Sequence, residues 1–358
     1  MGTKTNKNKQ HSRYSTFWKW SFRVLMGLAV LIVALIVWLR ISPWPGAMLI
    51  RHVFDEGGAK TAESLDKYAP QGIAVISNQQ YVAGDKDAKL DVYLPESTQS
   101  TNRRLPVVIW THGGAWLSGD KTEASAYYKL IAQAGYAVVA PSYSLAPEHT
   151  YPRAIHQLNS MYSYIQENAD RFHADTDKIV LAGDSAGAQL SAQMAALITN
   201  PAYAKEVGIT PSLKPTQLRG VVLNCGIYKM AELAHPNPTV SRLLGWGDDV
   251  TVWAYSGTHD FSDPIIRQMS PYYHVTKDYP PIFITGGNGD PLTNVQSKPM
   301  ADKLDSLGVS VTRLFYDPNH TPALPHEYQF NLDIGEGREA LRKILEFLDR
   351  QVHAPLGE

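Results

Sequence analysis

Hydrophobic residues follow two patterns along this chain. Near the N-terminus, residues 24–39 form an unbroken apolar run, VLMGLAVLIVALIVWL, bracketed by Arg23 and Arg40. Farther along, short apolar runs such as VVIW, AVVA, IVLA, GVVL and IFIT alternate with longer stretches of helical pattern. The first pattern predicts a membrane segment, and the second predicts a domain in which strands and helices alternate.

The short apolar runs predict a parallel sheet, because continuously apolar strands are typical of sheets covered by helices on both faces. The predicted strands are 72–82, 89–94, 106–111, 137–140, 178–182, 220–223, 281–285 and 309–316. The predicted helices are 125–134, 152–168, 186–199, 296–307 and 337–351. Residues 227–275 break the alternation with many Pro, Asp, Trp and Tyr residues, so we interpret them as an insertion that could form a lid. The length suits one α/β domain.

The apolar run near the N-terminus is long enough to approach the thickness of a bilayer. A helix over this run covers about 24 Å, against a hydrocarbon core of about 30 Å. Residues 1–23 carry six basic and no acidic side chains, which predicts that this end stays in the cytoplasm. We expect a basic cytoplasmic tail over 1–23, a transmembrane signal anchor over 24–40 and an extracytoplasmic domain over 45–358. The alternative is secretion after cleavage of a signal peptide, but no clear cleavage site follows the run.

The composition of the chain excludes several classes of function and site. The 358 residues have a net charge of -1, so the chain lacks the basic field that nucleic-acid binding needs. The single cysteine, Cys225, excludes an internal disulfide and a multi-cysteine zinc site. It ends an apolar strand, and we interpret it as a buried small hydrophobe. The histidines show no metal-ligand spacing, so we expect no metal and no cofactor.

The sharpest motif is Gly183-Asp-Ser185-Ala-Gly187, between an apolar strand and an alanine-rich helix. In this setting G-x-S-x-G forms a tight turn that presents a strained, nucleophilic serine, and its glycines remove Cβ atoms that would clash. The start of the helix offers a positive dipole end and the free N–H of Ala186. We expect Ser185 to be a nucleophile.

A glycine pair follows an earlier strand, in His112-Gly113-Gly114-Ala115. Glycines let the backbone approach a substrate and direct N–H groups at a developing oxyanion. Together with the nucleophile turn, this pattern predicts an oxyanion hole made of Gly113, Gly114 and Ala186, with Ala115 as a further candidate.

A nucleophilic serine of this kind needs an acid and a histidine later in the chain. Asp290 follows the strand PIFIT and is the predicted acid; Asp260 and Asp263 are weaker candidates, because no apolar strand delivers them. His320 and His326 both lie between the last predicted strand and the last predicted helix. The sequence pattern alone leaves both open as the base.

These residues together resemble the hormone-sensitive-lipase-like branch of the α/β-hydrolase superfamily, which holds bacterial carboxylesterases and acetyl esterases. The matching segments are HGGAW (112–116), YSLAPEH (143–149), GDSAG (183–187), DPL (290–292) and a histidine before the last helix. The resemblance covers most of the chain. It implies an α/β-hydrolase fold with a mostly parallel eight-stranded sheet, and a small cap from about 45–70 and 227–275. It also implies metal-free hydrolysis of short-chain carboxylic esters.

The chain departs from the family pattern at a few positions. Ala115 and Ala188 stand where the family often has glycine, and both replacements are small. The family histidine is often followed by Gly-Phe; the frame of His326-Glu-Tyr fits that position, whereas His320 fits the usual spacing from the acid. We favour His326 as the base, with His320 as the alternative.

Other functions use similar residues. An amidase, a formamidase or a peptidase could use the same triad, and leaving-group profiling would separate them from an esterase. A non-catalytic, membrane-tethered binding module would lack the nucleophile or the base, and neither is missing here. We therefore expect a serine carboxylesterase whose partners are a small-molecule ester substrate and, through the N-terminal helix, the membrane.

Overall fold

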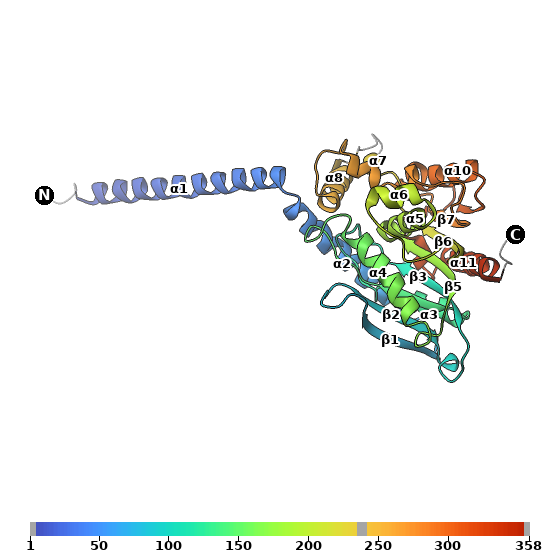
Figure 1. Ribbon diagram of the computed structural model, residues 1–358. Helices are drawn as coiled ribbons and strands as arrows, with labels where there is room; N and C mark the ends of the chain where they lie inside the picture. The colour runs from blue at the N-terminus through green and yellow to red at the C-terminus, as the bar shows by residue number, and fades with distance from the viewer. Residues whose placement is uncertain (1–4, 235–241, 354–358) are drawn as a thin grey trace. The chain divides into compact units, whose positions relative to one another are not determined.

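The computed structural model describes residues 5–234 and 242–353, and it divides into the units Met1–Gly46 and Ala47–Glu358. The first unit contains helix α1 (Thr5–Ile41), drawn in blue in Figure 1. Within it, Phe17–Ile41 has a mean hydropathy of 2.7 and no buried residues in its most apolar window. This helix is long and apolar enough to be a membrane span or a signal sequence, and it extends beyond the predicted 24–40 at both ends.

The second unit is built on one eight-stranded sheet, which confirms the predicted strands. In chain order the strands are β1 (Ile73–Gln80), β2 (Lys89–Pro95), β3 (Leu105–Thr111), β4 (Ala137–Pro141), β5 (Ala174–Asp184), β6 (Leu218–Asn224), β7 (Ile282–Gly286) and β8 (Val311–Phe315). Their spatial order is β1-β2-β4-β3-β5-β6-β7-β8. β2 pairs antiparallel with β1 and with β4, and the other neighbours pair in parallel. The sheet is therefore mostly parallel, as predicted.

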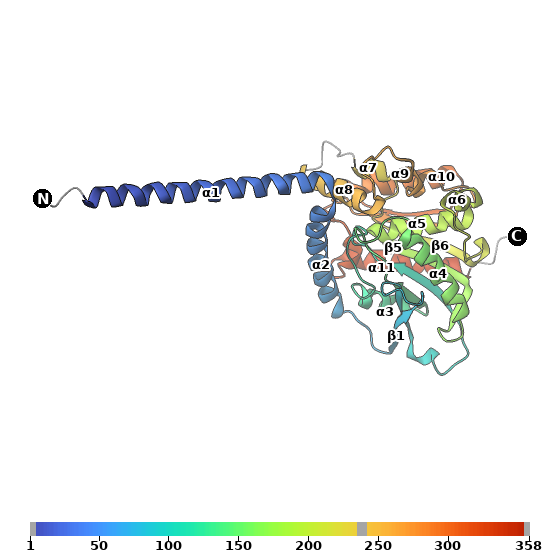
Figure 2. The ribbon, with the colours of Figure 1, turned by 60° about the vertical axis from the view of Figure 1, so that its left-hand side comes forward.

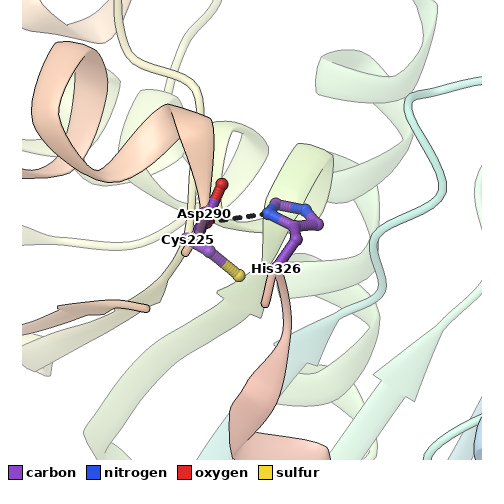
Figure 3. Close-up of side chains that lie close together, drawn as sticks. All are labelled: Cys225, Asp290 and His326. Atoms are coloured by element: carbon purple, nitrogen blue, oxygen red, sulfur yellow. Dashed lines mark hydrogen bonds and ion pairs between the residues drawn. The ribbon is translucent and has the colours of Figure 1, made fainter. Parts of the chain in front are cut away.

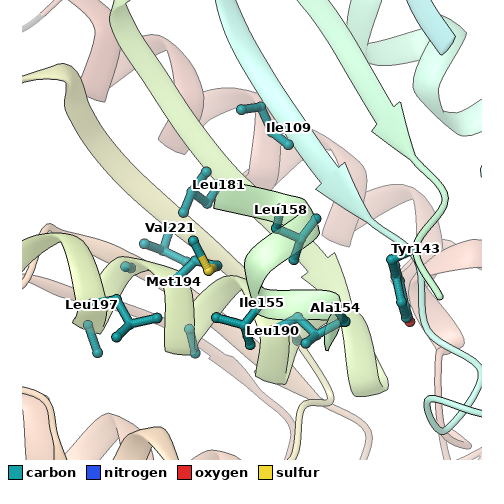
Figure 4. Close-up of a cluster of buried hydrophobic side chains, with 14 of the residues drawn as sticks. Ile109, Tyr143, Ala154, Ile155, Leu158, Leu181, Leu190, Met194, Leu197 and Val221 are labelled. Carbon is teal, nitrogen blue, oxygen red and sulfur yellow. The ribbon is translucent and has the colours of Figure 1, made fainter. Parts of the chain in front are cut away.

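Helices lie on both sides of the sheet (Figures 1 and 2). The predicted ones are α3 (Ser125–Gln133), α4 (Arg153–Glu167), α5 (Ser185–Thr199), α10 (Lys298–Ser306) and α11 (Gly335–His353). Alternate residues of β3 show why: Val107 and Ile109 join one buried cluster, while Val108 and Trp110 join another. The first cluster contains side chains of α4 and α5 (Figure 4), and the second contains side chains of α3 and α11. Apolar contact on both faces explains why the inner strands are continuously apolar.

The segments expected to form a cap are largely helical. Residues 45–70 contain most of α2 (Trp44–Asp66), and 227–275 contain α7 (Met230–Ala234), α8 (Arg242–Ser256) and α9 (Pro264–Gln268). A short helix, α6 (Pro201–Val207), follows α5. Residues 235–241 of the expected cap lie outside the described residues.

Strands β5, β6 and β7 end in register at one edge of the sheet. Asp184 pairs with Asn224, and Asn224 pairs with Thr285. In open α/β sheets, ligands bind at the carboxyl ends of the strands. The residues that follow these three strands are therefore where a functional site is expected.

Candidate active site

The nucleophile turn has the strained geometry expected of it. β5 ends at Asp184, and α5 begins at Ser185, whose φ of +49° lies in the left-handed region that non-glycine residues rarely adopt. A Cβ on Gly187 would lie 2.0 Å from the carbonyl oxygen of Thr111, and one on Gly183 would lie 2.4 Å from the carbonyl oxygen of Gly187. Glycine is therefore needed at 187 for the turn to pack against β3, and at 183 for the turn itself to close.

The structure joins Asp290 to one of the two candidate histidines. Nδ1 of His326 lies 2.9 Å from Oδ2 of Asp290, and Oδ1 of Asp290 accepts from the Leu292 N–H at 2.9 Å. The Asp290 side chain is fully buried, while that of His326 is 30% exposed. A proton on Nδ1 satisfies the carboxylate and leaves the lone pair of Nε2 free.

His320 is engaged elsewhere. Its Nε2 lies 2.8 Å from Oε1 of Glu336, in the first turn of α11. The loop after β8 therefore delivers His326, and not His320, to Asp290. The bond with Asp290 is what separates the two histidines that the sequence pattern left open.

The surroundings of the His326 imidazole shift its pKa upward. Burial disfavours the charged ring, but the neighbouring Cys225 and the Asp290 carboxylate outweigh that effect and raise the pKa of His326 well above its usual value. Burial also raises the pKa of the Cys225 thiol to about 11. A base in this position is protonated over a wider pH range than an ordinary histidine, so a reaction that needs the neutral ring is favoured by alkaline pH.

The predicted oxyanion residues do not all have free N–H groups. The Gly113 N–H donates to Oδ2 of Asp184 at 2.7 Å, so it is already occupied in this structure. The Gly114 N–H donates to no acceptor within residues 5–234 and 242–353. Gly114 has a φ of +96°, and a Cβ there would lie 2.2 Å from the carbonyl oxygen of Ser118. Ala186 is in the first turn of α5, where N–H groups have no partner within the helix.

Asp184 holds the loop of the predicted oxyanion hole, residues 112–115, which we call the oxyanion loop. It also faces a second acid, Glu327, that the sequence did not indicate. It accepts from Nε1 of Trp110 at 2.7 Å as well as from Gly113. A Cβ on Gly113 would lie 2.4 Å from Oδ2 of Asp184 and 2.9 Å from Oε1 of Glu327, so both carboxyl groups face one point. Burial and the neighbouring Glu327 raise the pKa of Asp184 well above its usual value.

Glu327 itself adopts a φ of +58°, a conformation that favours glycine. It stands directly after His326, at the position for which the resemblance to the hormone-sensitive-lipase-like branch implies a glycine. That departure is the signal in the sequence that could have drawn attention to it.

A cavity of about 280 Å³ lies beside the oxyanion loop. Its walls come from α2, from the oxyanion loop and from the two acids just described. The residues that line it include Val53, Phe54, Gly113, Gly114, Asp184 and Glu327. The expected cap segment over 45–70 therefore contributes a wall next to the loop that carries Gly114.

Cys225 lies at the candidate site, although its place in the sequence indicated only a small buried hydrophobe. It is buried, but it lies against the pair formed by Asp290 and His326 (Figure 3). The signal that could have found it is its position directly after β6, the strand between the one that delivers Ser185 and the one that leads to Asp290.

Comparison with known proteins supports the fold and indicates a family. Residues 90–304 match the family model described as BD-FAE. Carboxylesterase NlhH of Mycobacterium tuberculosis is 30% identical over 280 residues, which are 76% of this chain and 81% of that protein. Esterase LipC of the same species is 27% identical over 66% of this chain, and the match spans only 57% of LipC. An acetyl esterase of Salmonella choleraesuis is 26% identical over 58% of this chain and 60% of its own length.

Solved structures share the fold at lower identity. Esterase B from Lactobacillus rhamnosis superposes with a TM-score of 0.70 at 22% identity, covering 86% of this chain and 96% of that one. The Pyrobaculum calidifontis esterase gives a TM-score of 0.66 at 22% identity, covering 86% and 94%. These likenesses confirm the predicted fold.

Proposed function

Because the chain belongs to the BD-FAE family and has the α/β-hydrolase fold, we propose that it is a serine carboxylesterase. The observation that carries this proposal is the placement of the bonded pair His326 and Asp290 on the loops after β8 and β7, at the sheet edge where the strained Ser185 turn follows β5. The relatives named carboxylesterase, esterase and acetyl esterase support the same reaction.

In the proposed mechanism, Oγ of Ser185 attacks the carbonyl carbon of an ester, and Nε2 of His326 takes the serine proton. Asp290 holds the Nδ1 proton and stabilises the imidazolium that forms. His326 then gives the proton to the leaving alcohol as the acyl group stays on Ser185. A water molecule next attacks the acyl carbon while His326 takes its proton, and His326 returns that proton to Oγ of Ser185 as the carboxylic acid leaves.

The N–H groups of Gly114 and Ala186 are the proposed donors to the tetrahedral oxyanion. The loss of one such donor typically costs about 2.7–4 kcal/mol of transition-state stabilisation. Gly113 contributes indirectly, because its N–H ties the loop to Asp184 and thereby fixes the position of Gly114.

The proposed substrates are short-chain carboxylic esters, in line with the relative named acetyl esterase. Hydrolysis of p-nitrophenyl esters from acetate to laurate by the purified chain tests both parts of this proposal. We expect turnover that is highest for the shorter acyl groups and is lost in Ser185→Ala.

Ser160→Ala, at an exposed serine of α4, is the matched control and should behave as wild type. Faster hydrolysis of p-nitroanilides than of the matching esters would instead favour the amidase or peptidase alternative. Full activity in Ser185→Ala would rule out the proposed nucleophile.

We also propose that α1 is an uncleaved anchor that keeps the catalytic domain outside the cytoplasm. The support is the apolar, unburied Phe17–Ile41 segment and the six basic residues before position 24. Protease added to intact spheroplasts should degrade the domain, and the full-length chain should stay in the membrane pellet after alkaline extraction. A domain that stays protected would contradict the orientation, and a shortened chain in the soluble fraction would indicate a cleaved signal peptide.

A further inference from the structure

The imidazole of His326 meets two chemically different side chains, the thiol of Cys225 and the carboxylate of Asp290. Ligand atoms of Cys225, Asp290 and His326 all lie within 4.8 Å of one another (Figure 3). They come from segments that follow three neighbouring strands, β6, β7 and β8. Cys225 and Asp290 are 1% and 3% exposed, whereas the His326 side chain is 30% exposed and so connects the group to solvent.

The backbone fixes the thiol in this position. Cys225 has a φ of +43°, unusual for a residue with a side chain, and its N–H donates to the carbonyl oxygen of Thr285 at 2.9 Å. Sγ lies 4.0 Å from Oε1 of Gln329. No step of the proposed mechanism uses this thiol, although it is buried against the base.

We propose that Cys225, Asp290 and His326 form a binding site for a thiophilic divalent metal ion such as Zn²⁺, and that the bound ion inhibits the esterase. Thiolate, imidazole and carboxylate are the three ligand types that Zn²⁺ takes from proteins, with bonds of about 2.0–2.3 Å. Tetrahedral ligand atoms at those lengths lie about 3.3–3.6 Å apart. Nδ1 of His326 and Oδ2 of Asp290 are 2.9 Å apart, and the three ligand atoms lie within 4.8 Å of one another. Receiving an ion therefore requires His326 and Asp290 to separate by a few tenths of an ångström and the wider pairs to close by up to about 1.5 Å.

The inhibition follows from which ring nitrogen the ion takes. Nδ1 is the nitrogen that faces Asp290, so the ion replaces the proton between them and bonds to the Nδ1 lone pair. The ring proton then resides on Nε2, and the thiol of Cys225 releases its proton to solvent. Nε2 no longer has a lone pair with which to accept the Ser185 proton. This consequence rests on the proposed function, whereas metal binding itself does not.

The test uses the full chain in detergent and Cd²⁺ as the probe, because a Cd²⁺–thiolate bond absorbs in the ultraviolet. The chain has one cysteine, so this charge-transfer band reports on Cys225 alone. We expect the band to saturate at one Cd²⁺ per chain, and p-nitrophenyl acetate hydrolysis to fall over the same Cd²⁺ or Zn²⁺ range.

Cys225→Ser should abolish the band and weaken inhibition at least about tenfold, measured relative to the variant's own metal-free rate. His320→Ala, which removes a histidine bonded to Glu336 instead, is the matched control and should keep both effects. Absence of the band in the folded chain, or equal inhibition in Cys225→Ser, would overturn the proposal. If the chain shows the Cd²⁺–thiolate band but no esterase activity, the metal site is supported and the proposed function is rejected. The failure of one proposal can therefore be told from the failure of the other.

Discussion

Replacement of Asp290 by asparagine should abolish most of the activity without changing the shape of the side chain. Both carboxylate oxygens accept a hydrogen bond, one from the Leu292 N–H and one from Nδ1 of His326, each at 2.9 Å. An amide has only one oxygen, so its NH₂ group must face one of these donors. The Leu292 N–H is a backbone group that can only donate, whereas the imidazole can change its tautomer so that Nδ1 accepts instead.

We therefore expect the oxygen of the introduced amide to keep the Leu292 N–H and its NH₂ group to face Nδ1 of His326. That arrangement forces the ring proton onto Nε2 and removes the base from Ser185. The same tautomer error in other serine hydrolases lowers kcat by about 10⁴, which corresponds to about 5.4 kcal/mol of activation free energy.

The assay is p-nitrophenyl acetate hydrolysis by Asp290→Asn, with circular dichroism to show that the variant is folded. Asp317→Asn makes the same chemical change at an exposed aspartate that accepts from the Asn319 N–H, and it should retain wild-type kcat. If folded Asp290→Asn keeps more than about a tenth of the wild-type kcat, the assignment of Asp290 is wrong.

Three further outcomes follow from the same geometry. The residues around His326 raise its pKa, so the acidic limb of the pH profile of kcat/KM should have its midpoint above pH 6.5. A midpoint at or below that pH would contradict the upward shift of the His326 pKa. Gly187→Ala introduces a Cβ 2.0 Å from a backbone carbonyl oxygen and should lower the free energy of unfolding, measured by urea titration, by about 1–3 kcal/mol or more, whereas Gly57→Ala has open space and should not lower it. The pKa of Asp184 is raised on folding, so the stability that it contributes is present at low pH and is lost as the pH rises through the folded value. Glu327→Gln removes the carboxylate that faces Asp184. The urea midpoint of this variant should therefore fall less between acidic and alkaline pH than that of the wild type, and an equal fall would refute the pairing of Asp184 with Glu327.

The sequence predicted the sheet well for a physical reason. Inner strands such as β3 and β5 contact helices on both faces, so every residue is apolar and the run is visible without any structural context. Helix α2 was not predicted, because Pro45, Gly57 and Gly58 suggest a loop. Pro45 is tolerated in the first turn of a helix, and Arg51 ties α2 to Glu148 and to the Leu117 carbonyl oxygen. Such long-range contacts leave no periodic trace in the sequence.

The candidate site likewise contains some residues that the sequence pattern reveals and others that it does not. The turn at Ser185 and the position of Asp290 are local features of strand ends, and local pattern was enough to find them. The roles of Cys225 and Glu327 depend on which strands are neighbours and on a backbone conformation that only the folded loop reveals.

Covalent labelling by a p-nitrophenyl organophosphonate, followed by intact mass and peptide mapping, tests directly whether Ser185 is the nucleophile. We expect one adduct per chain, located on Ser185, with release of one equivalent of p-nitrophenol and loss of ester hydrolysis in the same proportion. No labelling of the folded chain, or an adduct on another residue with ester hydrolysis lost, would contradict this expectation.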